Sequence, residues 1–332
     1  MDVGRANRRW GRLVLYDVGL IVFGLALVAK GGDLFVGSSI QIGKIFGVPR
    51  FVIGGTLVSL ATTTPELVVS ANASFDGDAG MALGNAVGSC VCNIGLIVGT
   101  VALLTPVEIE KRDFVRRAGW MVLAAALVVA FTWNRTLSRP LSIVLLALSL
   151  AYLAWDYMGI RQQRVRALDE VGPADTSGLA RTVTFFVFGL GMIVAGSEFL
   201  VGSGQSLANA LGVSSAVIGL SVVAVGTSLP ELVTGVSAAR KGVPDLALGN
   251  IVGANVLNLS LVVGVSGVVR PLTFDLSTQV YSYSWLAIFF AVVIALVAWR
   301  GRFHRGGGLV LLVLYVVYLT GMAFLLPTEQ GI

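Results

Sequence analysis

Charge and histidine are both scarce in this sequence. Only 12% of its 332 residues are Asp, Glu, Lys or Arg, about half the share that a soluble domain usually carries. The one histidine is His304, which lies in a basic loop, so a Ser–His pair or a His-Glu-x-x-His metal motif is excluded. The two cysteines, Cys90 and Cys92, point to different faces of one predicted helix and are not expected to form a disulfide.

Long apolar runs take the place of the missing charge. Hydrophobic residues make up 56% of the chain, and the mean hydropathy is +0.87. Runs of about 18 or more apolar residues recur, which is the length that a membrane-spanning helix needs. The short alternating strands of a β-barrel do not appear, and the 41 glycines suit close packing of membrane helices. We therefore predict an all-α polytopic membrane protein, with the lipid bilayer as its surroundings.

Ten hydrophobic segments are expected to cross the membrane. They cover residues 13–46, 49–74, 79–104, 114–133 and 139–160, and then 182–211, 213–239, 245–269, 280–299 and 308–326. The polar stretch between the two groups is the expected linker. The predicted organisation is thus a first five-helix repeat with the N-terminal tail (1–160), a linker (161–181) and a second five-helix repeat (182–332).

The basic residues predict an orientation in the cell membrane. With the N-terminus outside, the inner loops hold fifteen Lys and Arg and the outer regions seven, which agrees with the positive-inside rule and places the linker in the cytoplasm. The four arginines of the N-terminal tail argue the other way. These loops also account for the pI near 9.5, so we expect no nucleic-acid partner.

The two halves repeat each other at a constant shift of 165 residues. Five segments separate each residue from its mate, and because five is odd, equivalent helices cross the membrane in opposite directions. Such inverted-topology repeats are typical of secondary transporters, which bind their substrate near the midplane where the halves meet. The mated positions include Thr62 with Thr227, Glu66 with Glu231, Asn85 with Asn250, and Asn93 with Asn258.

Each half carries a Pro-Glu pair in the middle of a hydrophobic segment. Pro65 and Pro230 each remove a backbone donor and clash with the carbonyl four residues earlier, at Ala61 and Gly226. The neighbouring turn is therefore expected to open. A backbone group freed in the membrane must be satisfied within the protein or by a bound species, and a cation can do this.

The two glutamates indicate what is bound. A carboxylate at the bilayer centre is costly, and Glu66 and Glu231 at equivalent depths repel each other unless a cation or a proton lies between them. Carboxylates, nearby hydroxyls and freed carbonyls form an all-oxygen ligand set, which suits hard cations such as Ca²⁺ or Na⁺.

Polar side chains on the next segment supply a second wall. Ser89 and Asn93 are four residues apart on one helix face, and their mates are Ala254 and Asn258. Hydrogen bonding between helices remains an alternative explanation for this face.

Four other acidic residues lie in or near the membrane, outside the Pro-Glu motifs. Asp33 and its mate Glu198 either line an access route or bind backbone at a helix end. Asp17 and Asp156 have no mates, and we interpret both as interfacial.

These motifs resemble those of a known family. The runs 62–66 (Thr-Thr-Thr-Pro-Glu) with 84–93, and 226–231 (Gly-Thr-Ser-Leu-Pro-Glu) with 249–258, resemble the α-repeats of the calcium/cation antiporter superfamily, most of all the prokaryotic sodium/calcium exchangers. The resemblance implies that Ca²⁺ binds to the two glutamates and that segments one and six slide across the other helices. It also implies further ligands for Ca²⁺ and Na⁺: the backbone carbonyls of Thr62 and Thr227, the hydroxyls of Thr63, Ser89 and Ser228, the carbonyls of Ser59 and Ala224, and the side chains of Asn93 and Asn258.

The sequence departs from the family pattern at three positions. Thr63 and Ala254 stand where serine is usual, and Asn258 stands where many prokaryotic members have aspartate. One expected sodium ligand is therefore missing, which leaves the number of sodium ions per cycle open.

The leading hypothesis is Ca²⁺/Na⁺ antiport by a monomer without a cofactor. The alternative is exchange of Ca²⁺, or of another divalent cation, for H⁺ through the same glutamates. An intramembrane enzyme is disfavoured, because the membrane segments hold no histidine and neither acidic motif resembles a Gly-x-Gly-Asp protease signature. A passive channel fits the inverted repeat with broken helices less well than alternating access does.

Overall fold

The computed structural model is mostly helical and describes residues 3–108, 110–171, 177–210, 224–274 and 276–325. Three π-helices, η1, η2 and η4, interrupt the α-helices. The first half contains α1 (Val3–Phe46), α2 (Arg50–Ile53), η1 (Gly54–Val58), α3 (Ser59–Thr62), α4 (Thr64–Asp76), α5 (Ala79–Cys92), η2 (Asn93–Val98), α6 (Gly99–Leu104), α7 (Lys111–Phe131) and α8 (Arg139–Val171). The second half contains α9 (Leu179–Ala210), α11 (Ala224–Thr227), α12 (Leu229–Arg240), α13 (Pro244–Leu257), η4 (Asn258–Val262), α14 (Val263–Val269), α15 (Leu276–Arg300) and α16 (Arg305–Leu325).

Eight helical stretches of the described residues are long and apolar enough to cross a membrane. They contain α1, α5 with α6, α7, α8, α9, α13 with α14, α15 and α16. A ninth candidate is the bent pair 50–62 and 64–76. The predicted segment 213–239 is described only from Ala224 onward, so the full ten-helix plan stays a prediction. Two boundaries differ from those expected: α1 begins at Val3, and α8 continues to Val171.

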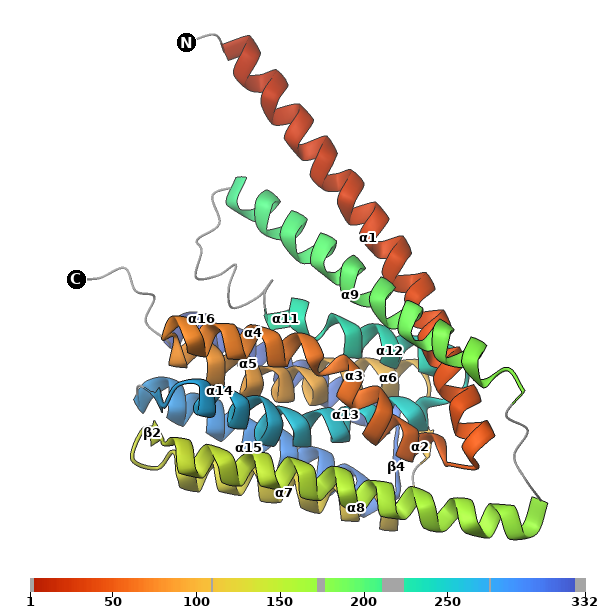
Figure 1. Cartoon of the computed structure of the whole chain (residues 1–332). Coiled ribbons are helices and arrows are strands. Elements are labelled where there is room, and N and C mark those ends of the chain that lie inside the picture. Colours follow the sequence, from red (N-terminus) through yellow and green to blue (C-terminus); the bar gives the residue numbers. More distant parts are fainter. Residues whose placement is uncertain (1–2, 109, 172–176, 211–223, 275, 326–332) are drawn as a thin grey trace.

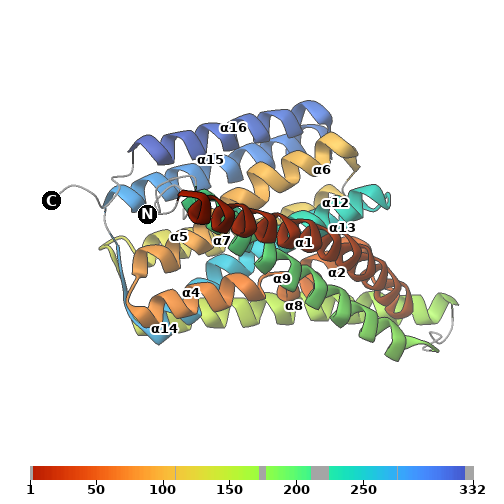
Figure 2. The ribbon, with the colours of Figure 1, turned by 90° about the horizontal axis from the view of Figure 1, so that it is seen from above.

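Helices α1 and α9 pack against each other and lie above the remaining helices, while α7 and α8 lie on the opposite side (Figure 1). Seen from above, the pair runs across the other helices (Figure 2). Glycines let the two backbones touch, because a Cβ added to Gly31 would lie only 2.8 Å from the Gly189 carbonyl oxygen, and one on Gly24 only 2.9 Å from that of Gly196. The predicted first segment is thus one helix that continues unbroken through Gly31.

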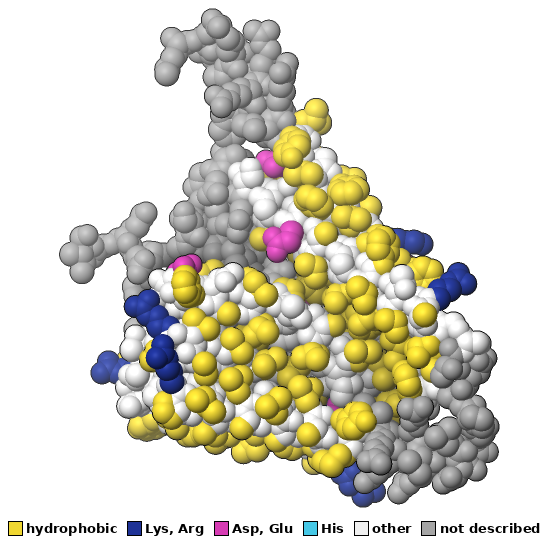
Figure 3. Space-filling view, viewed as in Figure 1, with side chains coloured by type: hydrophobic (Ala, Val, Ile, Leu, Met, Phe, Trp, Pro, Cys, Tyr) yellow, Lys and Arg dark blue, Asp and Glu magenta, His cyan; other side chains and the backbone are white. Residues whose placement is uncertain are grey.

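The centre of the molecule is formed by α5–η2 and α13–η4, whose side chains are mostly buried. By contrast, large apolar side chains of the outer helices are exposed, including Phe23, Leu150, Phe188 and Val316. One face of the molecule is accordingly covered with hydrophobic side chains, and Lys and Arg lie toward its margins (Figure 3). This distribution suits a protein whose solvent is lipid.

Two short antiparallel strand pairs connect the halves. β1 (Val107–Glu108) pairs with β4 (Arg302–Phe303), and β2 (Thr136–Leu137) pairs with β3 (Leu272–Thr273). At the 165-residue shift, β1 corresponds to β3 and β2 closely to β4, so the two pairs are counterparts of each other. β2 and β4 lie toward opposite ends of the helical block (Figure 1).

Glycine ends equivalent helices in the two halves. Gly77 follows α4 with φ 92°, and its mate Gly242 follows α12 with φ 69°. Residues with a side chain rarely adopt this left-handed conformation, which glycine adopts readily. In the first half, Asp78 then caps α5 by accepting a hydrogen bond from the Met81 amide at 2.8 Å.

Candidate functional site

Both Pro-Glu motifs interrupt their helices at mated positions. The first break lies at Thr63, between α3 and α4, and the two stretches that it separates are bent by 40°. The second lies at Ser228, between α11 and α12. The opened turn expected before each proline is confirmed at both places. Each break leaves a glutamate in the first turn of the following helix.

The two glutamates are buried and close enough for their charges to interact. Glu66 and Glu231 are both 0% exposed, and Glu66 lies within Coulomb range of Glu231. None of their four carboxylate oxygens has a hydrogen-bond partner of good geometry among the described residues. Such groups are rare, because burying an unpaired carboxylate is costly. The pair therefore forms a strongly negative pocket lined with free oxygen ligands.

Several neutral oxygens line the same region. The hydroxyls of Ser89 and Ser228 lie beside the Glu66 carboxylate, and the Thr62 hydroxyl lies beside that of Glu231. η2, which begins at Asn93, packs against α12, while η4, which begins at Asn258, packs against α4. The structure thus brings the side chains predicted for the site to helices that surround the two glutamates. Buried side-chain atoms here without a partner among the described residues are Thr63 Oγ1, Ser89 Oγ, Ser228 Oγ, Asn93 Oδ1, and Oδ1 and Nδ2 of Asn258.

The structure gives less support for the backbone carbonyls that are expected as ligands than for the side chains. The Ser59 carbonyl accepts a helical hydrogen bond from the Thr63 amide at 2.9 Å, so one of its two lone pairs is in use. Thr62 and Thr227 each end the helix before a break, which leaves their carbonyls at the opened turn. Ala224 begins α11 at the edge of the described residues. The ion-binding roles of these four carbonyls stay predictions.

Two of the π-helices among the described residues begin at mated positions, a feature that the sequence did not suggest. η2 starts at Asn93 and η4 at Asn258. A π-helical turn shifts the backbone by one residue and is often found at functional sites. The Asn93 amide donates to Asn255 Oδ1 at 3.0 Å. Its Oδ1 therefore remains available to a further partner.

The asparagines of the Gly-Asn pairs, Asn85 and Asn250, were matched in the repeat but not assigned to the site. Thr62 donates its hydroxyl to Asn250 Oδ1 at 3.2 Å, and Thr227 donates to Asn85 Oδ1 at 3.1 Å. Each bond joins one half of the chain to the other. Their repetition at the same shift as the glutamates is the one signal that pointed to them.

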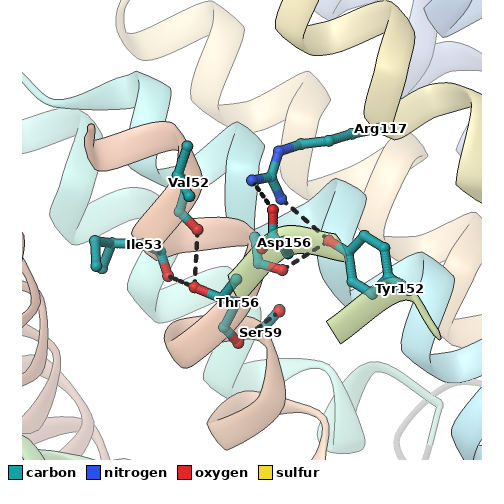
Figure 4. Close-up of polar contacts among 8 residues, drawn as sticks. Val52, Ile53, Thr56, Ser59, Arg117, Tyr152 and Asp156 are labelled. Carbon is teal, nitrogen blue, oxygen red and sulfur yellow. Dashed lines mark hydrogen bonds and ion pairs between the residues drawn. The ribbon is translucent and has the colours of Figure 1, made fainter. Parts of the chain in front are cut away.

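A buried ion pair supports the first broken helix from α7 and α8 (Figure 4). Arg117 pairs with Asp156 and donates to the Tyr152 hydroxyl at 3.2 Å. Tyr152 in turn donates to the carbonyl of Gly55, within η1, at 2.8 Å. Asp156, which we interpreted as interfacial, is only 3% exposed and pairs with a residue of another helix. Arg117, one of the fifteen Lys and Arg counted for the inner loops, lies within α7 and is likewise buried.

The acidic residues of α1 lie outside this site. Ser237 of α12 donates to Asp33 at 3.2 Å, and Lys241 Nζ lies 3.6 Å from the same oxygen. Asp17 accepts from Ser206 of α9 at 2.7 Å. Glu198, the mate of Asp33, is exposed. Asp33 therefore links α1 to the helix that carries Glu231.

The ligand set around the glutamates is poor in nitrogen and sulfur. Among the described residues, no three His, Cys, Asp or Glu side chains gather in a way that could hold a metal ion. Cys90 and Cys92 are buried free thiols, as their spacing predicted. Two carboxylates completed by neutral oxygens are the ligands of a hard cation.

Comparisons with known proteins agree with this chemistry. The sodium/calcium exchanger protein family matches residues 16–158 and 181–324. The sodium/calcium exchanger MaX1 of Methanosarcina acetivorans is 33% identical over 92% of this chain and 98% of its own length. Inner membrane protein YrbG of Escherichia coli is 32% identical over 95% and 99%.

A solved structure extends the likeness to three dimensions. A structure of the sodium-calcium exchanger NCX_Mj is similar with a TM-score of 0.79 and 29% sequence identity, and the match covers 94% of this chain and 100% of that one. The family match spans most of both halves and includes both Pro-Glu motifs. The chain is therefore a multi-span membrane protein that belongs to the sodium/calcium exchanger family, within the prokaryotic calcium/cation antiporters.

Proposed function

We propose that this protein exchanges Ca²⁺ for Na⁺ through one shared site built on Glu66 and Glu231. The observation that carries the proposal is the set of four buried carboxylate oxygens without a partner, placed just after the two helix breaks. Two negative charges balance one Ca²⁺ or two Na⁺, and either cation relieves the repulsion between the carboxylates. Because both ions use the same oxygens, binding of one displaces the other, and this competition is the basis of exchange.

The remaining ligands are neutral oxygens from both halves. Hydroxyls beside the glutamates suit Na⁺ as well as Ca²⁺, since both are hard cations. Ca²⁺ takes six to eight oxygens, more than two carboxylates supply. The proposed ligands beyond the glutamates are the carbonyls of Thr62, Thr227, Ser59 and Ala224, the hydroxyls of Thr63, Ser89 and Ser228, and the side chains of Asn93 and Asn258.

The proposed transport cycle is alternating access by ten helices in two inverted repeats, 1–160 and 182–332, joined by the linker 161–181. The mated helix breaks, the mated glycines after α4 and α12, and the corresponding strand pairs support this symmetry. α1 and α9 lie across the other helices as a pair (Figure 2), and we propose that they slide over them. We expect a monomer to suffice, with no enzymatic activity.

The proposed location is the cell membrane, with the N-terminus outside and the linker in the cytoplasm. The fifteen-to-seven distribution of Lys and Arg supports this orientation. The name of the Escherichia coli relative places that protein in the inner membrane. A reporter that is active only in the cytoplasm, inserted between residues 161 and 181, should be active, and an inactive reporter would reverse the orientation.

Ion flux tests the proposal directly. Purified protein in liposomes loaded with Na⁺ should take up ⁴⁵Ca²⁺ when the outside is free of Na⁺, and uptake should stop when the Na⁺ gradient is removed. Empty liposomes are the control. Absence of gradient-driven uptake would overturn the sodium claim, and uptake without any counter-ion would indicate a channel.

Exchange of H⁺ for Ca²⁺ is the second candidate. It is favoured by Ala254 and Asn258, which supply neither a hydroxyl nor a carboxylate at positions where sodium-binding oxygens are expected. In this case protonation of the same glutamates releases Ca²⁺. Ca²⁺ uptake driven by a pH gradient in sodium-free buffer would support H⁺ exchange, and Ca²⁺ uptake that does not depend on pH would exclude it.

A further inference from the structure

We propose that Asn85 and Asn250 are positioning residues that hold the two broken helices of the ion site in register from opposite halves. The inference deepens the proposed function and rests on it. Asn250 of α13 accepts the hydroxyl of Thr62 at 3.2 Å, and Asn85 of α5 accepts that of Thr227 at 3.1 Å. The two bonds are counterparts at the 165-residue shift. Each asparagine therefore holds the last residue of the helix that precedes the break in the other half.

The direction of the Thr62 hydroxyl is unusual for a helical threonine. A threonine within a helix commonly bonds the carbonyl four residues earlier. Thr56, Thr100 and Thr132 do so here, with oxygen–oxygen distances of 2.9, 2.7 and 2.7 Å. Thr62 donates across to Asn250 of another helix instead, and Thr227 donates across to Asn85. The bonds to Asn250 and Asn85 therefore hold in place the two threonines whose backbone carbonyls lie at the opened turns.

Asn85 also reaches the glutamate of its own half. Its amide nitrogen donates to the Glu66 carbonyl at 3.3 Å and to the Ser70 hydroxyl at 2.9 Å. One side chain thus connects the first turn of α4, where Glu66 lies, to Thr227 at the end of α11. The side-chain amide of Asn85 thereby holds α4 at a fixed distance from α11.

The two asparagines are not equivalent. The Nδ2 atom of Asn250 is buried and has no partner among the described residues. The mate of Ser70 is Gly235, which offers no hydroxyl at the corresponding place. Loss of Asn85 is therefore expected to disturb the site more than loss of Asn250.

The expected consequence is weaker ion binding rather than slower transport of bound ions. Ca²⁺ requires its oxygens at about 2.3–2.6 Å, so broken helices that are free to shift bind it less tightly. Thr62→Val and Thr227→Val keep the backbone carbonyl and nearly the same shape but remove the hydroxyl. Each should raise the KM for Ca²⁺ about fivefold to tenfold, the factor that loss of one buried hydrogen bond corresponds to. The maximal rate should change little.

The experiment measures Na⁺-driven ⁴⁵Ca²⁺ uptake over a range of Ca²⁺ concentrations. Thr62→Ser and Thr227→Ser restore the hydroxyl and should restore the KM. Thr132→Val is the matched control, because Thr132 is as fully buried as Thr62 and its hydroxyl lies 2.8 Å from that of Tyr283, in a contact outside the site. Because the Thr62 hydroxyl also lies beside Glu231, Asn250→Ala, which keeps that hydroxyl, should likewise raise the KM. Asn85→Ala should raise the KM at least as much as Thr227→Val, and the double variant of these two should be no worse than Asn85→Ala alone.

Three results would overturn the inference: a wild-type KM in both valine variants, an equal rise in Thr132→Val, or additive effects in the double variant. If Asn85→Ala does not fold, the valine and serine variants decide the question alone. Failure of the proposed function is a different result, since wild-type protein would then show no Na⁺-driven uptake.

Discussion

At the scale of single residues, the two walls of the site differ although the glutamates match. Ser89 has a free hydroxyl beside Glu66, while its mate Ala254 has none. Asn258 is neutral, so among the described residues only two carboxylates contribute charge to the site. In the proposed mechanism, Ca²⁺ binding depends on the two glutamates, which are equivalent in both halves, and Na⁺ binding depends more on the hydroxyls, which are not.

Restoring the missing hydroxyl should therefore strengthen sodium binding. Ala254→Ser adds one oxygen at a fully buried position, and we expect a lower Na⁺ concentration for half-maximal ⁴⁵Ca²⁺ uptake. Ser89→Ala is the converse variant and should raise that concentration. Thermal unfolding of each variant checks that the fold is kept. An unchanged Na⁺ dependence in both would show that neither position binds sodium.

The site residues that the sequence predicts most directly are those whose motif occurs in both halves of the repeat. Glu66 and Glu231 stood out because ionisable groups are costly in a bilayer and because the same motif surrounds both. The bonds of Thr62 and Thr227 could not be foreseen in this way. Their partners lie 188 and 142 residues away, and no local pattern specifies which side chain a buried hydroxyl will meet.

At the scale of elements, the helix breaks were predictable and the π-helices were not. Proline removes a backbone donor wherever it stands, so the breaks near Thr63 and Ser228 follow from local chemistry. The turns that begin at Asn93 and Asn258 depend on packing against α12 and α4. The burial of Asp156 was missed for the same reason, since Arg117 lies on another helix.

The Arg117–Asp156 pair should matter for stability. Asp156→Asn leaves a buried guanidinium without its counter-charge, and breaking such a pair typically costs about 3–5 kcal/mol. The exposed pair of Asp33 with Lys241 offers a control, because surface pairs contribute at most about 1 kcal/mol. Denaturant unfolding in detergent should show a much larger loss for Asp156→Asn than for Asp33→Asn. Equal losses would mean that the buried pair does not anchor η1.

At the scale of the whole molecule, the repeat was visible in the residues themselves, whereas the placement of α1 and α9 across the other helices was implied only by the family resemblance. A shift of 165 residues says which helices are equivalent. It does not say that two of them leave the block and cross over it. The glycines of α1 and α9 let these two helices pack closely on each other.

Sliding of α1 against α12 can be tested with a reversible cross-link. A Cβ on Gly32 would lie 3.6 Å from the Cβ of Ser237, within the range for a disulfide, although the side chain of Val233 must shift. The variant carrying Gly32→Cys and Ser237→Cys should lose ⁴⁵Ca²⁺ exchange when oxidised and regain it with reductant. The single variants control for the substitutions themselves. Exchange at the wild-type rate by fully cross-linked protein would contradict sliding.

Equilibrium binding of ⁴⁵Ca²⁺ to purified protein tests most directly whether Glu66 and Glu231 form one site. The proteins to compare are wild type, Glu66→Gln, Glu231→Gln and the double variant, at constant low Na⁺. One shared site predicts that either single change abolishes specific binding and that the double variant is no worse. Two independent sites predict instead that each single variant keeps half of the bound Ca²⁺, and that result would contradict the account.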